Sequence, residues 1–133
     1  MIVVDASVLV CALADDGRDG VDVRTRLLGE HLVAPEVIDL EVASALRRLC
    51  AAGTLPGQRA EQALGDLTQL RMERVRHQPL LRRCWELRHN LTVYDATYVS
   101  LAESISGTLV TADERLACAP RLPCAVELIQ VGR

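Results

Sequence analysis

Residues 1–14, MIVVDASVLVCALA, change character at a single acidic residue, Asp5. The first four residues are apolar and mostly β-branched, which is typical of a buried strand. Residues 6–14 are small or apolar and contain no Gly or Pro, which indicates a helix. The stretch therefore predicts one strand that leads directly into one helix, with Asp5 at the junction.

The same alternation continues along the rest of the chain. Further strands are predicted at residues 31–34, 72–76, 108–111 and 125–131. Helices are predicted at residues 21–28, 35–49, 56–70, 95–106 and 113–119, with another that begins near Pro79. Alternation of this kind favours a parallel sheet with helices on both faces, so we expect an α/β fold class. No repeat or linker interrupts the pattern, which predicts a single domain over residues 1–133.

Composition limits the class of protein. Half of the 133 residues are hydrophobic, which predicts a folded globule. No apolar run approaches the roughly 18 residues of a membrane span, and no basic segment precedes the apolar N-terminus. We therefore expect a cytoplasmic protein that does not enter a membrane. The five Cys include no CxxC pair, so free thiols in a reducing compartment are expected, although Cys118 and Cys124 flank a Pro-containing loop that could bring them together.

One charge stands out in the segment APEVIDLEVASALRRL, residues 34–49. Its apolar residues recur at helical spacing, but Glu41 lies at the edge of this apolar stripe. No Arg lies three or four positions away to pair with it. A carboxylate near a core is unfavourable without compensation, and either a distant Arg such as Arg48 or a bound cation could supply it.

Three other acids lie where a predicted helix begins: Asp5, Asp95 and Asp113. Each alone has a simple explanation, because Asp is a good helix N-cap. Ligands of open parallel sheets, however, bind beyond the carboxyl ends of the strands. If the three acids converge there with Glu41, they repel one another, and a divalent cation removes that repulsion. Oxygen-only ligands favour Mg²⁺ or Mn²⁺, and the neighbouring hydroxyls of Ser7 and Thr111 could hold a carboxylate in place.

These acids also carry a resemblance to a known family. The segments VVDASVLV, LEVASAL, YDATYVSLAE and LVTADERLA resemble the four acidic motifs of PIN-domain ribonucleases, and in particular the VapC-type toxins of toxin–antitoxin pairs. The resemblance implies a three-layer α/β/α sandwich with a central, mainly parallel sheet. It implies Mg²⁺- or Mn²⁺-dependent endonuclease action on RNA by a homodimer. It also implies inhibition by a cognate, VapB-like antitoxin, through which alone the protein would meet DNA.

Carried over by motif, the implied catalytic and metal-binding residues are Asp5, Glu41, Asp95 and Asp113. The implied supporting hydroxyls are those of Thr111 and, more weakly, Ser7.

Six of the fifteen basic residues, all of them Arg, fall between residues 71 and 88 of a chain whose net charge is −3. This segment is either a solvated surface or a contact for the RNA backbone, and Arg82 and Arg83 are the candidate RNA contacts. The chain has few aromatic residues, which argues against an extensive base-stacking surface. Tyr98 and Trp85 are expected to be packed.

Two alternatives fit the acids without a nuclease. In a receiver-type or haloacid-dehalogenase-type phosphotransfer domain, Asp5 would accept the phosphoryl group. Such domains usually need a partner Lys, which this chain lacks, and the second type wants an Asp where Ser7 stands. In a non-enzymatic, partner-binding α/β domain, the acids would only cap helices.

Overall fold

The computed structural model describes residues 1–132 and contains five strands and seven α-helices in that range. The elements follow the order β1 (Ile2–Val4), α1 (Ala6–Ala14), α2 (Arg18–Leu27), β2 (Leu32–Pro35), α3 (Ile38–Ala51), α4 (Gly57–Gln69), β3 (Glu73–Val75), a 3₁₀ turn (Gln78–Leu80), α5 (Leu81–Glu86), α6 (Val93–Ser104), β4 (Thr108–Thr111), α7 (Glu114–Ala117) and β5 (Ala125–Leu128). No helix among the described residues is long and apolar enough to cross a membrane.

The five strands form one parallel sheet in the order β3-β2-β1-β4-β5. The chain winds outward from β1 through β2 to β3 and then returns to place β4 on the other side of β1. Val4 at the end of β1 is therefore opposite Val110 in β4. In sheets of this kind a crevice opens where the winding reverses, beyond the carboxyl ends of the two central strands. Here the winding reverses between β1 and β4, and we use the word crevice for the place beyond the carboxyl ends of these two strands.

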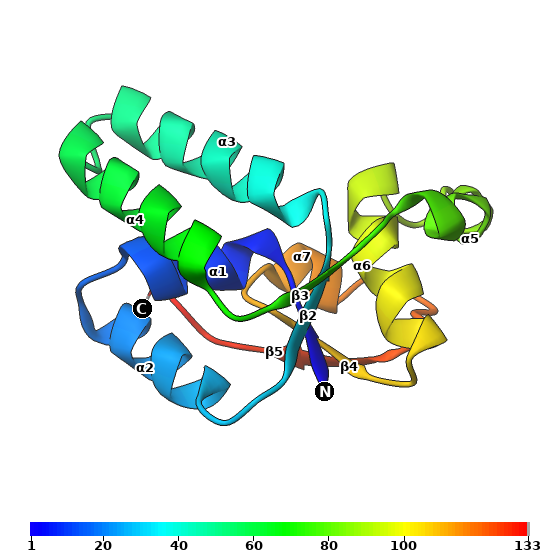
Figure 1. The fold of residues 1–133 in the computed structure, drawn as a ribbon. Helices are drawn as coiled ribbons and strands as arrows, with labels where there is room; N and C mark the ends of the chain where they lie inside the picture. The colour runs from blue at the N-terminus through cyan, green and yellow to red at the C-terminus, as the bar shows by residue number, and fades with distance from the viewer. Residues whose placement is uncertain (133) are drawn as a thin grey trace.

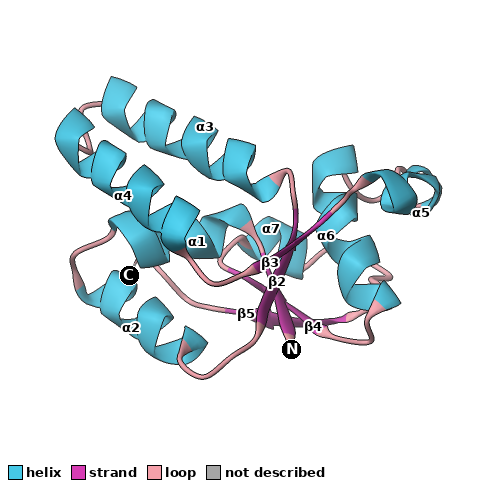
Figure 2. Cartoon of the chain, viewed as in Figure 1, coloured by secondary structure: helices cyan, strands magenta, loops and turns pink. Residues whose placement is uncertain are grey.

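Helices cover both faces of the sheet, which gives the three-layer α/β/α sandwich expected from the resemblance (Figure 2). α6 packs against β1, β2 and β4, whereas α1 packs against β4 and contacts α2, α3 and α4 (Figure 1). Seven successive residues of α6, 96–102, are buried, as are all of β1 and the last three residues of β4. The core thus fixes α6 and the two strands whose ends meet at the crevice.

All five predicted strands are present, but three helices with a predicted first residue begin two or three residues away from it. α2 begins at Arg18, three residues before the predicted start at residue 21. A glycine is needed at position 20 of this helix, because a Cβ there would come within 1.8 Å of the Asp15 carbonyl oxygen. Pro35 ends β2, where it is opposite Val75, and does not begin the next helix.

The third difference concerns a candidate site residue. α6 begins at Val93, two residues before the predicted start, and its N-cap is Thr92. The Thr92 hydroxyl accepts a hydrogen bond from the backbone N–H of Asp95 at 3.1 Å. The Asp95 carboxylate is therefore not the helix cap, so capping explains Asp5 and Asp113 but not Asp95.

Candidate active site

Asp5 is the buried centre of the crevice. It follows β1 directly, caps α1 by accepting a hydrogen bond from the Val8 N–H, and is only 6% exposed. Both carboxylate oxygens are engaged: Ser7 donates to Oδ1 at 2.6 Å and Thr111 donates to Oδ2. Burial raises the pKa of the Asp5 carboxyl, although these hydrogen bonds oppose the shift. Asp5 is thus an oriented carboxylate whose negative charge is poorly compensated.

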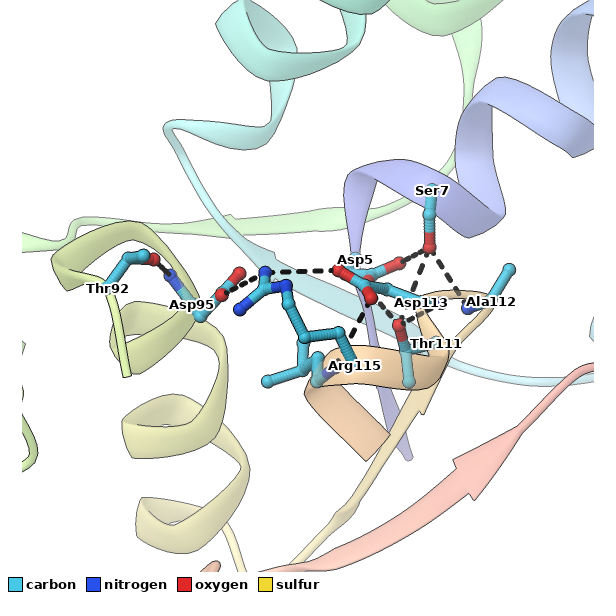
Figure 3. Close-up of polar contacts among 9 residues, drawn as sticks. Asp5, Ser7, Thr92, Asp95, Thr111, Ala112, Asp113 and Arg115 are labelled. Carbon is cyan, nitrogen blue, oxygen red and sulfur yellow. Dashed lines mark hydrogen bonds and ion pairs between the residues drawn. The ribbon is translucent and has the colours of Figure 1, made fainter. Parts of the chain in front are cut away.

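The two hydroxyls that hold Asp5 are themselves held by backbone N–H groups beyond β4 (Figure 3). The Ser7 Oγ accepts from the N–H of Ala112 at 3.0 Å, and the Thr111 Oγ1 accepts from the N–H of Asp113 at 3.0 Å. This network ties the end of β1 to the end of β4. The predicted supporting hydroxyls therefore contact Asp5, and Thr111 does so from a fully buried position.

The Glu41 carboxylate is held by a residue that the sequence patterns did not identify as its partner. The Tyr98 hydroxyl, on α6, donates a hydrogen bond to Glu41 Oε1 at 2.5 Å. Arg48 instead donates to Ser44 and is only the weakest influence on the pKa of Glu41. That pKa is raised by burial first, and then by the negative charges of Asp95 and Asp5. A tyrosine therefore orients the carboxylate, and the unfavourable charge remains.

Asp95 and Asp113 share one cation, the guanidinium of Arg115 (Figure 3). Arg115 Nη2 lies 2.8 Å from Asp95 Oδ2 and 3.3 Å from Asp113 Oδ2. Asp113 also caps the short α7 by accepting from the Leu116 N–H. The bond to Asp95 is the largest cause of the raised pKa of Arg115. The sequence did not identify Arg115 as a site residue. The one feature that could have indicated it is its position two residues after Asp113.

The four acids influence one another but do not touch. The charge of Asp113 raises the pKa of Asp5, and the charges of Asp5 and Asp95 raise that of Glu41. Within residues 1–132, however, no three Asp, Glu, His or Cys side chains are grouped closely enough to hold a metal ion. Each carboxylate is instead held by another side chain: Asp5 by Ser7 and Thr111, Glu41 by Tyr98, and both Asp95 and Asp113 by Arg115.

The donor chemistry nevertheless suits a hard divalent cation. Asp5, Glu41, Asp95 and Asp113 supply carboxylate oxygens, and the buried, mutually repelling charges of two of them favour a compensating ion. Neither a thiolate nor an imidazole is among their contacts in the described part of the chain. These four residues would hold such an ion once Arg115 leaves Asp95 and Asp113.

Comparison with known proteins identifies the family. The sequence model of the PIN domain family matches residues 2–122. The chain is 42% identical to "Ribonuclease VapC1" of Mycobacterium tuberculosis over 129 residues, which are 96% of this chain and 97% of that protein. It is 40% identical to "VapC ribonuclease Mb0985" of Mycobacterium bovis, over 97% of this chain and 98% of that protein. The chain belongs to the PIN domain family, in its VapC branch.

Solved structures agree with this PIN-domain fold. PAE2754 from Pyrobaculum aerophilum superposes with a TM-score of 0.70 at 23% identity and covers 94% of this chain and 87% of that one. VapBC2 from Rickettsia felis, solved bound to a DNA fragment from its promoter, superposes with a TM-score of 0.69 at 15% identity, over 98% of this chain and 100% of that one. At these identities the likeness concerns the fold alone.

Two of the six Arg residues between residues 71 and 88 of this PIN domain form ion pairs within the described part of the chain. Arg74 pairs with Asp39, and Arg83 binds Glu103 at 2.9 Å and Glu86 at 3.6 Å. Arg82, by contrast, is exposed and forms no ion pair within residues 1–132. Of the two candidate RNA contacts, Arg82 is thus the one whose guanidinium is available.

The aromatic residues of the PIN domain differ in exposure. Tyr98 is buried, as expected, but the expectation that Trp85 is packed was wrong. Trp85 is 63% exposed, and the Arg88 guanidinium lies 4.4 Å from the centre of its ring. All five Cys are free, in agreement with the sequence.

The raised pKa values of Asp5 and Glu41 predict an unusual pH dependence for the metal-free PIN domain. An unfolded carboxyl releases its proton near pH 4, whereas these two retain it to higher pH in the folded chain. Between the two values the folded state binds more protons, so we expect the free energy of unfolding to fall as pH rises above about 4. Urea unfolding in EDTA between pH 5 and pH 8 measures this slope.

The Asp5→Asn, Glu41→Gln double variant is the control for this slope. It should unfold with a free energy that changes less over the same pH range, because neither amide titrates. An identical slope in the two proteins would contradict the assignment. The lowered pKa values of Asp16 and Glu127 act in the opposite sense and only at lower pH, so they do not mask the effect.

Proposed function

We propose that this PIN domain is a Mg²⁺- or Mn²⁺-dependent endoribonuclease that cleaves RNA phosphodiester bonds at the site of Asp5, Glu41, Asp95 and Asp113. One observation supports the proposal most strongly: the negative charge of Asp113 raises the pKa of Asp5, and the negative charges of Asp95 and Asp5 raise the pKa of Glu41, although the four acids come from different elements. The VapC relatives, which are named ribonucleases, support the choice of RNA as substrate.

The chain's own residues orient the donors for this reaction. Ser7 and Thr111 fix both oxygens of Asp5, while Tyr98 fixes one oxygen of Glu41. Glu41 Oε2 accepts no hydrogen bond within the described residues, so this oxygen remains available for a ligand or a water. A bound Mg²⁺ or Mn²⁺ lowers the pKa of a water and neutralises charge that develops on a phosphoryl group.

The direct test is RNA cleavage by the purified chain, freed of bound protein, with and without Mg²⁺ or Mn²⁺. Cleavage should require the cation and be lost in Asp95→Asn, whose side chain neither caps a helix nor lies in the core. Cleavage that persists in EDTA or in the variant would refute a nuclease built on these acids. Labelling of Asp5 as an acyl phosphate would instead favour phosphotransfer.

Tyr98→Phe is expected to lower cleavage about tenfold, because loss of a hydrogen bond to a charged group is worth roughly 1.5–3 kcal/mol. The hydroxyl lowers the pKa of Glu41, so its removal should also move the acid limb of the pH–rate profile to higher pH. Tyr94→Phe is the matched control, since Tyr94 lies one turn earlier on α6 and is 60% exposed. Equal profiles in both variants would show that Tyr98 does not position Glu41.

For substrate binding we propose that Arg82, on α5, contacts the RNA backbone. Arg82→Gln should reduce the dependence of binding on salt by about one unit of slope, as expected for the loss of one phosphate contact. Arg83→Gln should change it less, because Glu103 and Glu86 already neutralise Arg83. Arg18→Gln, on the distant α2, provides a control for loss of an exposed Arg (Figure 1). An unchanged slope in Arg82→Gln would exclude this contact.

Two partners complete the proposal. A cognate VapB-like antitoxin would inhibit the chain and mediate any contact with DNA; the Rickettsia felis VapBC2 structure, solved with promoter DNA, supports such a pairing. Co-expression with the small reading frame beside the gene should then abolish cleavage. We also propose a homodimer, supported by exposed apolar side chains on α3, α5 and α6: Leu40, Leu81, Trp85, Val93 and Tyr94. Sedimentation analysis measures that state.

A further inference from the structure

One residue of the crevice has no role in the proposed function: Arg115. Its side chain is 65% exposed, yet its guanidinium reaches back to two carboxylates that are 18% and 34% exposed, those of Asp95 and Asp113. These carboxylates come from different elements, α6 and the start of α7. Arg115 thus forms a cationic bridge across the crevice (Figure 3).

The bridge occupies the oxygens that a metal ion would need. Arg115 Nη2 contacts Oδ2 of both Asp95 and Asp113, and Asp113 Oδ1 already accepts the Leu116 N–H. A divalent cation at these carboxylates would repel the Arg115 guanidinium. The two cations would therefore compete for Asp95 and Asp113.

A released Arg115 would remain at the crevice. It is tethered through α7, within two residues of Asp113, and its long side chain is largely in solvent. A guanidinium presents several N–H donors in a planar fork that matches the oxygens of a phosphate. An RNA phosphate held at the acids would bring such oxygens to the place that Arg115 can reach.

We propose that Arg115 is a substrate-binding residue that changes partners: it bridges Asp95 and Asp113 in the metal-free chain, and binds an RNA phosphate when a divalent cation engages these carboxylates. The inference rests on the proposed function and extends it. Arg115 would offset part of the negative charge of Asp95 and Asp113 in the empty crevice and become available to RNA only after the site is loaded.

Two binding measurements with opposite expected signs test this role. In the first, Mn²⁺ is titrated into the metal-free chain without RNA. Arg115→Gln removes the competing cation, so the Kd for Mn²⁺ should fall about 3- to 10-fold, as expected for the loss of two exposed ion pairs. Arg18→Gln removes an exposed Arg from α2 and should leave the Kd unchanged.

In the second measurement, RNA binding is followed in Ca²⁺, with a gel to verify that the RNA stays intact. Arg115→Gln should bind RNA about 3- to 10-fold more weakly and lose about one unit of salt slope. Arg115→Lys, which retains the charge, should recover most of the affinity. A purely structural bridge would change metal binding without weakening RNA binding.

The inference requires both results. An unchanged or higher Kd for Mn²⁺ in Arg115→Gln, or unchanged RNA binding, overturns it. The proposed function is separately testable in the same titration. If the unaltered chain binds no Mn²⁺, or if Asp5→Asn binds it equally well, the proposed metal centre is wrong. If the unaltered chain binds Mn²⁺ and Asp5→Asn binds it more weakly, a negative result for Arg115→Gln contradicts only the role of Arg115.

Discussion

Asp5→Asn is expected to lower metal-dependent RNA cleavage by about a thousandfold or more, since loss of several kcal/mol of charge stabilisation has that effect. The substitution keeps the shape of the side chain. Its carbonyl oxygen can still accept from Ser7 and from the Val8 N–H, and its amide can donate to Thr111, whose hydroxyl has a free lone pair. The fold should therefore survive while the central anion is lost. Cleavage rates under single-turnover conditions measure the effect.

Stability gives a second readout for Asp5→Asn, in the opposite direction. Burial of this carboxylate is unfavourable in the metal-free chain, as its raised pKa indicates. The variant should thus unfold at a higher temperature than the unaltered chain in EDTA at neutral pH, but gain less from added Mg²⁺. Asp66→Asn, at an exposed position of α4, should change neither property. Cleavage near the unaltered rate in Asp5→Asn would refute the central role of this residue.

Leu109→Ala is expected to lower the free energy of unfolding by about 3 kcal/mol, which is typical for a fully buried leucine. Leu109 is 0% exposed in the middle of β4, where it is opposite Val3 in β1 and Val126 in β5. Shortening it leaves a cavity between the strands that form the crevice. Urea unfolding at pH 7 measures the change.

Leu28→Ala is the matched control, because Leu28 is 77% exposed and its truncation should cost less than about 0.5 kcal/mol. Molecules of Leu109→Ala that remain folded should still cleave RNA, since the Thr111 hydroxyl keeps its hydrogen bond to Asp5 and the Asp113 N–H keeps its hydrogen bond to Thr111. A decrease of less than about 1 kcal/mol in the free energy of unfolding of Leu109→Ala would contradict the packing of β4 inside the sheet.

The fold was largely predictable because its signals are local. Strand-type runs and helical spacing predicted all five strands and the parallel α/β class. One error arose because two local preferences compete. Gly20 is a weak helix former, yet it lies in α2, where its missing Cβ lets the backbone pass very close to the Asp15 carbonyl oxygen five residues earlier.

The candidate site was predictable only in part. Asp5 and Asp113 could be placed at strand ends, and Glu41 at the edge of an apolar stripe, from the sequence alone. The partner of Glu41 could not, because Tyr98 lies 57 residues away. One signal did exist. Asp95 and Tyr98 are three residues apart on one helix and therefore lie on the same helix face, so Tyr98 is expected near any site that includes Asp95.

The sequence by itself determined the α/β class, the acids at the ends of β1 and β4, and the unfavourable position of Glu41, because each depends on neighbours within a few residues. Only the tertiary structure decided that β4 lies beside β1, which makes those strand ends one crevice. It alone decided that a tyrosine holds Glu41 and that Arg115 bridges two acids. The physical reason is that strand order and side-chain partners depend on contacts between segments that are distant in the sequence. Local periodicity carries no information about such contacts.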